Sequence, residues 1–295
     1  MIIMRKLAIL LGTSMILALY GRGDSQHADQ MINIGSHSLQ IHREGKGAPA
    51  IVIDAGITDR LEKLRPLQER LARVTLVITY NRAGYGQSEP GPLPRDVGRE
   101  AGELKAMLEK ASVRGPYVLV GHSLGALNVQ VFASRYPHDV AGMILLDPPP
   151  LSFILGKDYP GLGAMAMRMT AEWQAIADAA AKSNDSQDKA KSTFFRMIAS
   201  EHREMFGETA RLVVGISTFG GIPLVVVAAG KPNPRFGEGA EEYQRYWIEQ
   251  SRALTAKSAR GRFVLAGESS HYLYLDAPEL VAENILSVVS EARAK

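Results

Sequence analysis

The sequence predicts an α/β protein with one mostly parallel, eight-stranded sheet flanked by helices. Short apolar runs alternate with helical patterns along most of the 295 residues, as in chains that build parallel sheets. With 46% hydrophobic residues, the chain can also bury a large core. One long interval after the sixth strand breaks the alternation and predicts a helical insertion.

The N-terminus has the layout of a secretory signal. Arg5 and Lys6 precede an apolar run at 7–19, and a polar stretch follows at 21–30. The run is shorter than the roughly 20 residues that span a bilayer, so we expect residues 1–28 to be a signal peptide. No clean cleavage site follows, which leaves an uncleaved N-terminal anchor as the alternative. We therefore expect a secreted or periplasmic protein, with membrane contact only through an uncleaved leader.

Eight strands are predicted in order. The first two, at 31–34 and 38–42, alternate in polarity and form a hairpin that turns at Gly35 and Ser36. The other six are continuous apolar runs, typical of strands covered on both faces. They occupy 51–53, 76–78, 117–120, 143–146, 224–227 and 263–265. Helical patterns lie between them at 61–71, 96–108, 124–135, 241–254 and 280–289.

The insertion divides the chain into a core and a cap. We expect residues 29–150 and 222–295 to form the core and 151–221 to form a helical cap. The cap is rich in Met and aromatic residues, which pack more often than they bind ligands. A lid over a site would nevertheless make some of them pocket walls. They include Met165, Met169, Trp173, Phe194, Phe195, Met197, Met205 and Phe206.

The strongest chemical signal is the string Gly-His-Ser-Leu-Gly at 121–125. It follows the apolar strand at 118–120 and precedes a helical pattern, which is the setting of a nucleophile elbow. In such a turn the serine backbone is strained, and side chains two positions away would clash with strand and helix. Ser123 is therefore the candidate nucleophile, and a buried serine in a glycine-rich turn is the alternative.

A serine hydroxyl needs a nearby base, and His271 is the best candidate. It follows the last strand and precedes the last helix, so it belongs to the carboxyl edge of the sheet. The other histidines lie in the leader or first hairpin, beside the nucleophile, in a turn or in the insertion. They are His27, His37, His42, His122, His138 and His202.

The base needs an acidic partner, and two aspartates compete for that role. Asp147 directly follows the strand at 143–146, so its carboxylate belongs to the same edge of the sheet. Asp276 is close to His271 in sequence, but the string Asp-Ala-Pro-Glu at 276–279 predicts a helix N-cap. We therefore choose Asp147, with helix capping as its alternative role.

Two backbone N–H groups are expected to stabilise an oxyanion. One is that of Leu124, directly after the serine. The other is that of Ile57, which follows the strand at 51–53 and the turn at 54–56. Gly56 leaves that backbone free to turn inward.

The composition excludes several other kinds of site. The absence of cysteine excludes disulfides, thiolate metal sites and cysteine nucleophiles. The 34 Lys and Arg residues are interleaved with 31 acidic ones, so the net charge of +3 does not indicate nucleic-acid binding. No His-Glu-x-x-His string or phosphate loop is present. We expect a small-molecule substrate, no nucleic-acid partner, no metal and no cofactor.

From residue 32 onward, the chain resembles the α/β-hydrolase superfamily in its capped esterase, prolyl aminopeptidase and haloalkane dehalogenase-like branch. The resemblance implies an α/β-hydrolase fold with the cap inserted after the sixth strand. The matching segments are 54–56, 80–88, 121–125, 136–137, 145–148, 270–272 and 276–279.

The chain departs from this family pattern at two places. Many relatives carry the acid in a Gly-x-x-Asp turn after the next-to-last strand, but here that turn ends in Asn233. Some members place the acid one strand earlier, where Asp147 stands. Asn81 also replaces an aspartate that is commonly structural, so it casts no doubt on activity.

These residues predict a serine hydrolase that works through an acyl-enzyme. The apolar insertion favours a small to medium hydrophobic ester, and amides or peptides with a free N-terminus are alternatives. A serine at the elbow disfavours dehalogenase or epoxide hydrolase chemistry, for which relatives use aspartate. Two other interpretations stay open: a non-hydrolytic enzyme of the same fold, such as a lyase, and a receptor with a dormant site.

Overall fold

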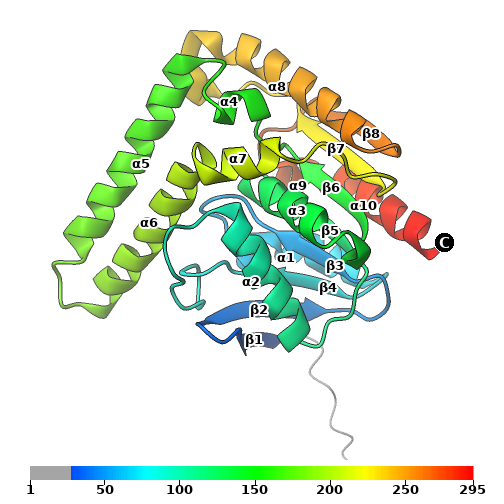
Figure 1. Ribbon diagram of the computed structural model, residues 1–295, viewed down its shortest axis with the longest axis horizontal. Coiled ribbons are helices and arrows are strands. Elements are labelled where there is room, and N and C mark those ends of the chain that lie inside the picture. Colours follow the sequence, from blue (N-terminus) through cyan, green and yellow to red (C-terminus); the bar gives the residue numbers. More distant parts are fainter. Residues whose placement is uncertain (1–27, 295) are drawn as a thin grey trace, which may run out of the picture.

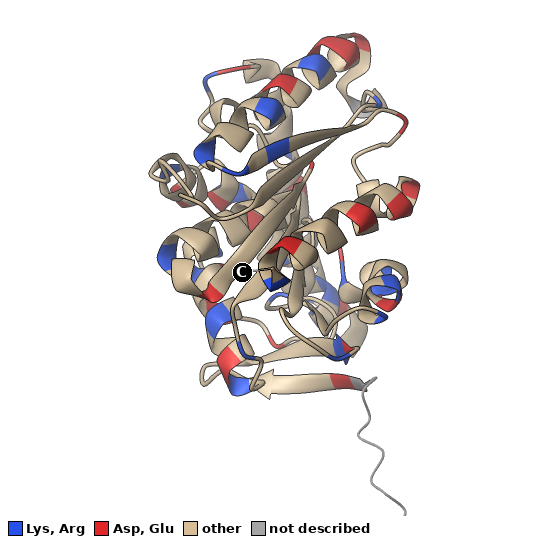
Figure 2. Cartoon of the chain, turned by 90° about the vertical axis from the view of Figure 1, so that its right-hand side faces the viewer, with Lys and Arg blue, Asp and Glu red and all other residues tan. Residues whose placement is uncertain are grey.

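The computed structural model describes residues 28–294 (Figure 1). Of the predicted leader, residues 1–28, all but Ala28 lie outside the described residues, and Ala28 begins the first strand. Within 28–294, no helix is both long and apolar enough to span a bilayer. Basic and acidic residues are interspersed over the side drawn in Figure 2.

The centre of the molecule is an eight-stranded sheet in the order β1-β2-β4-β3-β5-β6-β7-β8. β1 and β2 are antiparallel to each other, β2 is antiparallel to β4, and all other neighbours are parallel. This confirms the predicted mostly parallel α/β sheet. The strands are β1 (Ala28–Asn33), β2 (Ser38–Glu44), β3 (Ile51–Asp54), β4 (Val77–Tyr80), β5 (Tyr117–His122), β6 (Val140–Leu146), β7 (Leu224–Ala229) and β8 (Gly261–Ala266).

Helices cover both faces of the sheet, which explains why its central strands are apolar without alternation. In β3, Ile51 and Ile53 pack with α1 and α10, while Val52 points to the opposite face and packs with α2 and α3. The core helices are α1 (Leu61–Ala72), α2 (Val97–Lys110), α3 (Leu124–Arg135), α8 (Ala240–Leu254), α9 (Leu273–Asp276) and α10 (Pro278–Arg293).

The last strand differs from the expectation that it is covered on both faces. β8 pairs only with β7 and forms one edge of the sheet. Leu265 is 46% exposed, and the guanidinium of Arg252 lies over the ring of Phe263 at 4.1 Å. An apolar run alone does not distinguish a central strand from an edge strand that a long side chain shields.

Four helices fill the interval between β6 and β7. Figure 1 shows α5 and α6 as a projecting antiparallel pair, with α7 crossing above α3. Asp185 caps α6 by accepting hydrogen bonds from the amides of Gln187 and Asp188. The helices are α4 (Leu151–Ile154), α5 (Pro160–Ala180), α6 (Ser186–Met205) and α7 (Glu208–Val214).

A buried ionic cluster joins this insertion to the core. Arg82, which follows β4, lies 2.8 Å from Asp54 Oδ1 and 3.0 Å from Glu201 Oε1 on α6. Tyr85 also donates a hydrogen bond to Glu201. Burial alone would lower the pKa of Arg82, but Glu201 and the other nearby acidic groups raise it well above its usual value. The cluster therefore fixes α6 to the strand ends.

Candidate active site

Ser123 lies in a sharp turn between β5 and α3. β5 ends at His122 and α3 begins at Leu124, so one residue connects the strand to the helix. The backbone of Ser123 has φ 52° and ψ −117°, a conformation that residues other than glycine rarely adopt. Such strain is typical of functional sites, and here it exposes the side chain at the carboxyl edge of the sheet.

The two glycines of this turn are required by close contacts. A Cβ at Gly121 would lie 2.5 Å from the carbonyl oxygen of Gly125. A Cβ at Gly125 would lie 2.3 Å from the carbonyl oxygen of Asp54. Because both contacts are with backbone atoms, no side chain can move aside to relieve them. The steric argument made from the sequence is therefore confirmed.

Asp147 and His271 are in direct contact. Asp147 follows β6, and His271 lies between β8 and α9. Oδ2 of Asp147 is 2.6 Å from Nδ1 of His271. Because an ionised carboxylate can only accept hydrogen bonds, this contact places the proton on Nδ1 and leaves Nε2 able to accept another.

The backbone holds the Asp147 carboxylate in a fixed orientation. Its Oδ1 accepts a hydrogen bond from the amide of Ala229 at 2.9 Å. The amide of Asp147 in turn donates to the carbonyl of Val227 at 2.7 Å. Asp147 is buried. Its positive φ of 46° ends the strand and turns the side chain toward β7.

One cavity of about 180 Å³ has Ser123 and His271 in its wall. The predicted oxyanion donors, Ile57 and Leu124, line the same cavity. Leu124 begins α3, so its N–H has no acceptor within the helix and is free for a ligand. The rest of the wall is mainly apolar. It consists of Pro149, Phe153, Leu162, Met165, Ala166, Met169, His202, Met205, Phe206, Phe236, Tyr243 and Trp247.

The sequence did not indicate several of these wall residues as members of the site, among them the aromatic residues of α8 and a histidine of the insertion. Tyr243 and Trp247 come from α8, and the centroid of the Trp247 ring is 6.1 Å from that of His271. His202, which sequence reasoning set aside because it lies in the insertion, also lines the cavity. Helical periodicity showed that 241–254 forms a helix, but it did not show which of its residues meet a site.

The apolar residues of the insertion divide into two groups. Met165, Met169, Met205 and Phe206 line the cavity, as expected for a lid. The others, Trp173, Phe194, Phe195 and Met197, pack together with Tyr85 in a separate cluster. The insertion therefore supplies both the wall of the site and a small core of its own.

A second histidine supports the backbone of His271. Nε2 of His122 donates to the carbonyl of His271 at 2.8 Å, because a carbonyl can only accept. Nδ1 of His122 lies 3.6 Å from Asp59. Burial by itself would raise the pKa of Asp59, but its interactions with His122 and Lys63 hold that pKa below the usual range. Burial lowers the pKa of His122.

Asp276 does not cap the last helix, contrary to the sequence prediction. The N-cap residue of α10 is Ala277, because the short helix α9 extends through Asp276. Oδ2 of Asp276 instead accepts a hydrogen bond from the amide of Ser270 at 2.7 Å. The carboxylate thus braces the loop that carries His271, while Asp147 contacts the imidazole.

The turn at 230–233 lies beside Asp147 in space. Asn233 and Asp147 both line a small cavity of about 100 Å³ next to His271. The two positions at which members of the superfamily place their acid are therefore neighbours in this chain. Asn81 has a structural role, since its Oδ1 accepts from the amide of Leu61 and its Nδ2 donates to Gln40.

Within the described part of the chain, no group of three or more His, Cys, Asp or Glu side chains is placed to hold a metal ion. The candidate catalytic groups at the cavity are the hydroxyl of Ser123, the imidazole of His271 with the carboxylate of Asp147 behind it, and backbone amides. This set can transfer a proton from the hydroxyl to the imidazole and stabilise a developing oxyanion.

Comparisons with known proteins agree with this architecture. A family model described as "Alpha/beta hydrolase family" matches residues 58–284. The chain is 27% identical over 241 residues to the uncharacterized protein YqjL of Bacillus subtilis. The aligned region covers 81% of this chain and 83% of YqjL. It is 29% identical over 119 residues to 2-(acetamidomethylene)succinate hydrolase of Mesorhizobium japonicum, covering 40% of this chain and 42% of that protein.

A solved structure with the same architecture is that of a thermophilic esterase from Thermogutta terrifontis. The TM-score is 0.67, and the match covers 90% of this chain and 99% of the esterase. Sequence identity is 17%, so this likeness concerns the fold alone.

Proposed function

The chain belongs to the alpha/beta hydrolase family, and we propose that it is a serine hydrolase that cleaves a small to medium, hydrophobic ester or amide. The observation that carries this proposal is the 2.6 Å contact between Asp147 and His271, together with the cavity that His271 shares with Ser123. The contact orients Nε2 as a base, and the shared cavity is where a serine would meet its substrate.

In the proposed reaction, Oγ of Ser123 attacks the carbonyl carbon of the substrate while Nε2 of His271 takes the hydroxyl proton. The carbonyl oxygen becomes an oxyanion, which the amides of Ile57 and Leu124 stabilise. His271 then gives the proton to the departing alcohol or amine, and the acyl group stays on Ser123. Water attacks this ester with the help of His271, which releases the acid and restores the serine.

Asp147 supports the proposed reaction without itself gaining or losing a proton. Its carboxylate accepts the Nδ1 hydrogen of His271 and stabilises the imidazolium that forms in each half of the reaction. The fixed position of Asp147, with its second oxygen bonded to Ala229, keeps the imidazole in the required tautomer. Each oxyanion donor contributes about 3 to 4 kcal/mol to transition-state stabilisation in such sites.

The cavity wall supports the proposed substrate class. Methionine and aromatic side chains from α5, α6 and α8 surround Ser123, and their surfaces favour an apolar acyl or alcohol group. The volume of about 180 Å³ limits the bound part to a short or medium chain. The leader pattern at 1–28 further supports an activity outside the cytoplasm.

A substrate panel tests the proposal. Purified protein is assayed with p-nitrophenyl acetate, butyrate and octanoate, and with aminoacyl p-nitroanilides. We expect turnover of the short esters and a loss of about a millionfold in Ser123→Ala. Ser183→Ala, a partly exposed serine between α5 and α6 that does not line the cavity, is the matched control and should keep full activity. Full turnover by the Ser123→Ala protein would refute the assignment. No reaction with any substrate in the folded wild type would favour the lyase or receptor interpretation.

A further inference from the structure

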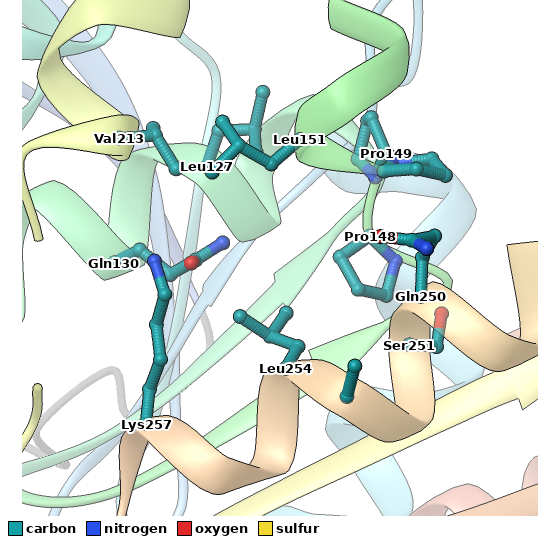
Figure 3. A pocket seen from close by; sticks show the side chains of 12 residues that line it. Leu127, Gln130, Pro148, Pro149, Leu151, Val213, Gln250, Ser251, Leu254 and Lys257 are labelled. Carbon is teal, nitrogen blue, oxygen red and sulfur yellow. The ribbon is translucent and has the colours of Figure 1, made fainter. Parts of the chain in front are cut away.

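A second cavity, of about 190 Å³, lies against the three prolines at 148–150 (Figure 3). Pro149 is part of the wall of this cavity and of the one that Ser123 lines. Most of the second wall is apolar, with Leu127 from α3 and Leu254 from α8 among its residues. Its chemistry is separate from that of the candidate active site, since neither Ser123 nor His271 lines it.

Two buried polar atoms of this wall lack a hydrogen-bond partner among the described residues. They are Oε1 of Gln130 and Oγ of Ser251, on side chains of residues that are 1% and 2% exposed. Nε2 of Gln130 donates to the carbonyl of Ala126, which leaves its oxygen as an acceptor for something else. Leaving such groups unpaired is costly in a folded protein, so the free oxygen of Gln130 indicates a ligand that donates a hydrogen bond to it.

Lys257 adds a positive charge to the same wall. It ends the short 3-10 helix Thr255–Lys257 after α8, and Figure 3 shows its side chain extending along the cavity on the side where Gln130 lies. Burial lowers the pKa of Lys257, and among residues 28–294 no carboxylate pairs with the ammonium group to offset that burial. A half-buried cation without a partner attracts an anion.

We propose that this cavity binds a short-chain hydroxycarboxylate. The carboxylate accepts hydrogen bonds from Lys257, whose side chain extends on the side of the cavity where Gln130 lies. A hydroxyl group on the ligand donates to Oε1 of Gln130, a role that a carboxylate cannot fill. The short carbon chain packs on Leu127 and Leu254. A cavity of about 150 Å³ holds benzene in another protein, so this one has room for a molecule such as 3-hydroxybutyrate.

Isothermal titration of the whole protein with 3-hydroxybutyrate, butyrate and 1,3-butanediol tests the proposal. We expect a Kd on the order of 1 mM for 3-hydroxybutyrate, with weaker binding of butyrate and of the uncharged diol. Lys257→Met should weaken the binding of 3-hydroxybutyrate about 10- to 100-fold, and Gln130→Met, which removes the acceptor of the ligand's hydroxyl, about 2- to 10-fold. Lys110→Met, an exposed lysine at the end of α2, is the matched control and should bind like wild type.

Direct binding keeps this test independent of the proposed catalysis, since Lys257 does not line the cavity around Ser123. Circular dichroism and thermal unfolding establish that each variant is folded, and Gln130→Met replaces Lys257→Met as the deciding variant if the latter fails to fold. The proposal is overturned if wild type does not bind 3-hydroxybutyrate. It is also overturned if the folded deciding variant binds it as tightly as wild type.

Discussion

Acidification should destabilise the fold through His202, which the cap buries. His202 is 4% exposed, and its Nδ1 is 2.6 Å from Oγ1 of Thr170. The centroids of the Trp173 and His202 rings are 5.2 Å apart. Burial lowers its pKa from 6.5 to about 4. The perturbation is a change from pH 7 to pH 4, applied to the wild type and to a His202→Gln variant.

The direction of the effect follows from which state binds the proton. Between pH 6.5 and about 4, the unfolded chain protonates His202 while the folded chain does not. The free energy of unfolding contributed by His202 is therefore fully present above pH 6.5 and is lost as the pH falls toward 4. At about 1.4 kcal/mol per pKa unit, the loss is about 3 kcal/mol.

Urea unfolding, followed by tryptophan fluorescence at pH 7, 6, 5 and 4, measures this contribution. Other groups titrate in both proteins, so the informative quantity is the difference between wild type and variant. We expect His202→Gln to lose about 3 kcal/mol less than wild type between pH 7 and pH 4. His138→Gln, an exposed histidine, should follow wild type. Equal losses in the wild type and His202→Gln would refute the reasoning.

Three further predictions concern the residues that build the site. Asp147→Asn should lower turnover of an ester substrate about 10⁴-fold with an unchanged circular dichroism spectrum. The control Asp276→Asn should keep most of the activity. Near-normal turnover in Asp147→Asn would mean that another residue is the acidic partner of His271. Gly125→Ala places a Cβ 2.3 Å from the Asp54 carbonyl and should cost about 3 kcal/mol in thermal unfolding. The control is Gly102→Ala in α2, where a Cβ meets no atom within 4 Å and should stabilise the protein by about 0.5 to 1 kcal/mol. Equal effects of the two changes on stability would contradict the steric argument. Arg82→Met leaves Asp54 and Glu201 without their buried cation and should lower the free energy of urea unfolding by about 3 to 5 kcal/mol. The control Arg70→Met, at the exposed pair with Glu279, should lower it by less than about 1 kcal/mol. Similar losses in the two variants would mean that the buried cluster does not secure α6.

Local patterns were sufficient to predict the sheet and the elbow. The apolar runs at 51–53 and 117–120 lie in strands whose alternate residues pack with helices on opposite faces. The glycines at 121 and 125 carry a steric requirement that depends only on the chain passing directly from strand to helix. Both signals are local in sequence.

Contacts between distant segments could not be predicted in the same way. His202 reaches the cavity because α6 is secured to Arg82, and nothing in the sequence near position 202 reports that packing. Trp247 and Tyr243 meet the site for the same kind of reason, through the position of α8. The capping role predicted for Asp276 failed because α9 continues through it, and boundaries between short helices are the least certain part of a sequence pattern.

The most direct test of the proposed mechanism is the intact mass of the protein after treatment with a fluorophosphonate, which modifies an activated serine. The proposal predicts one adduct per chain on Ser123 in wild type, none in Ser123→Ala and much slower labelling in His271→Ala. An unlabelled wild type, or a Ser123→Ala protein that reacts as fast as wild type, would contradict the claim that His271 activates this hydroxyl.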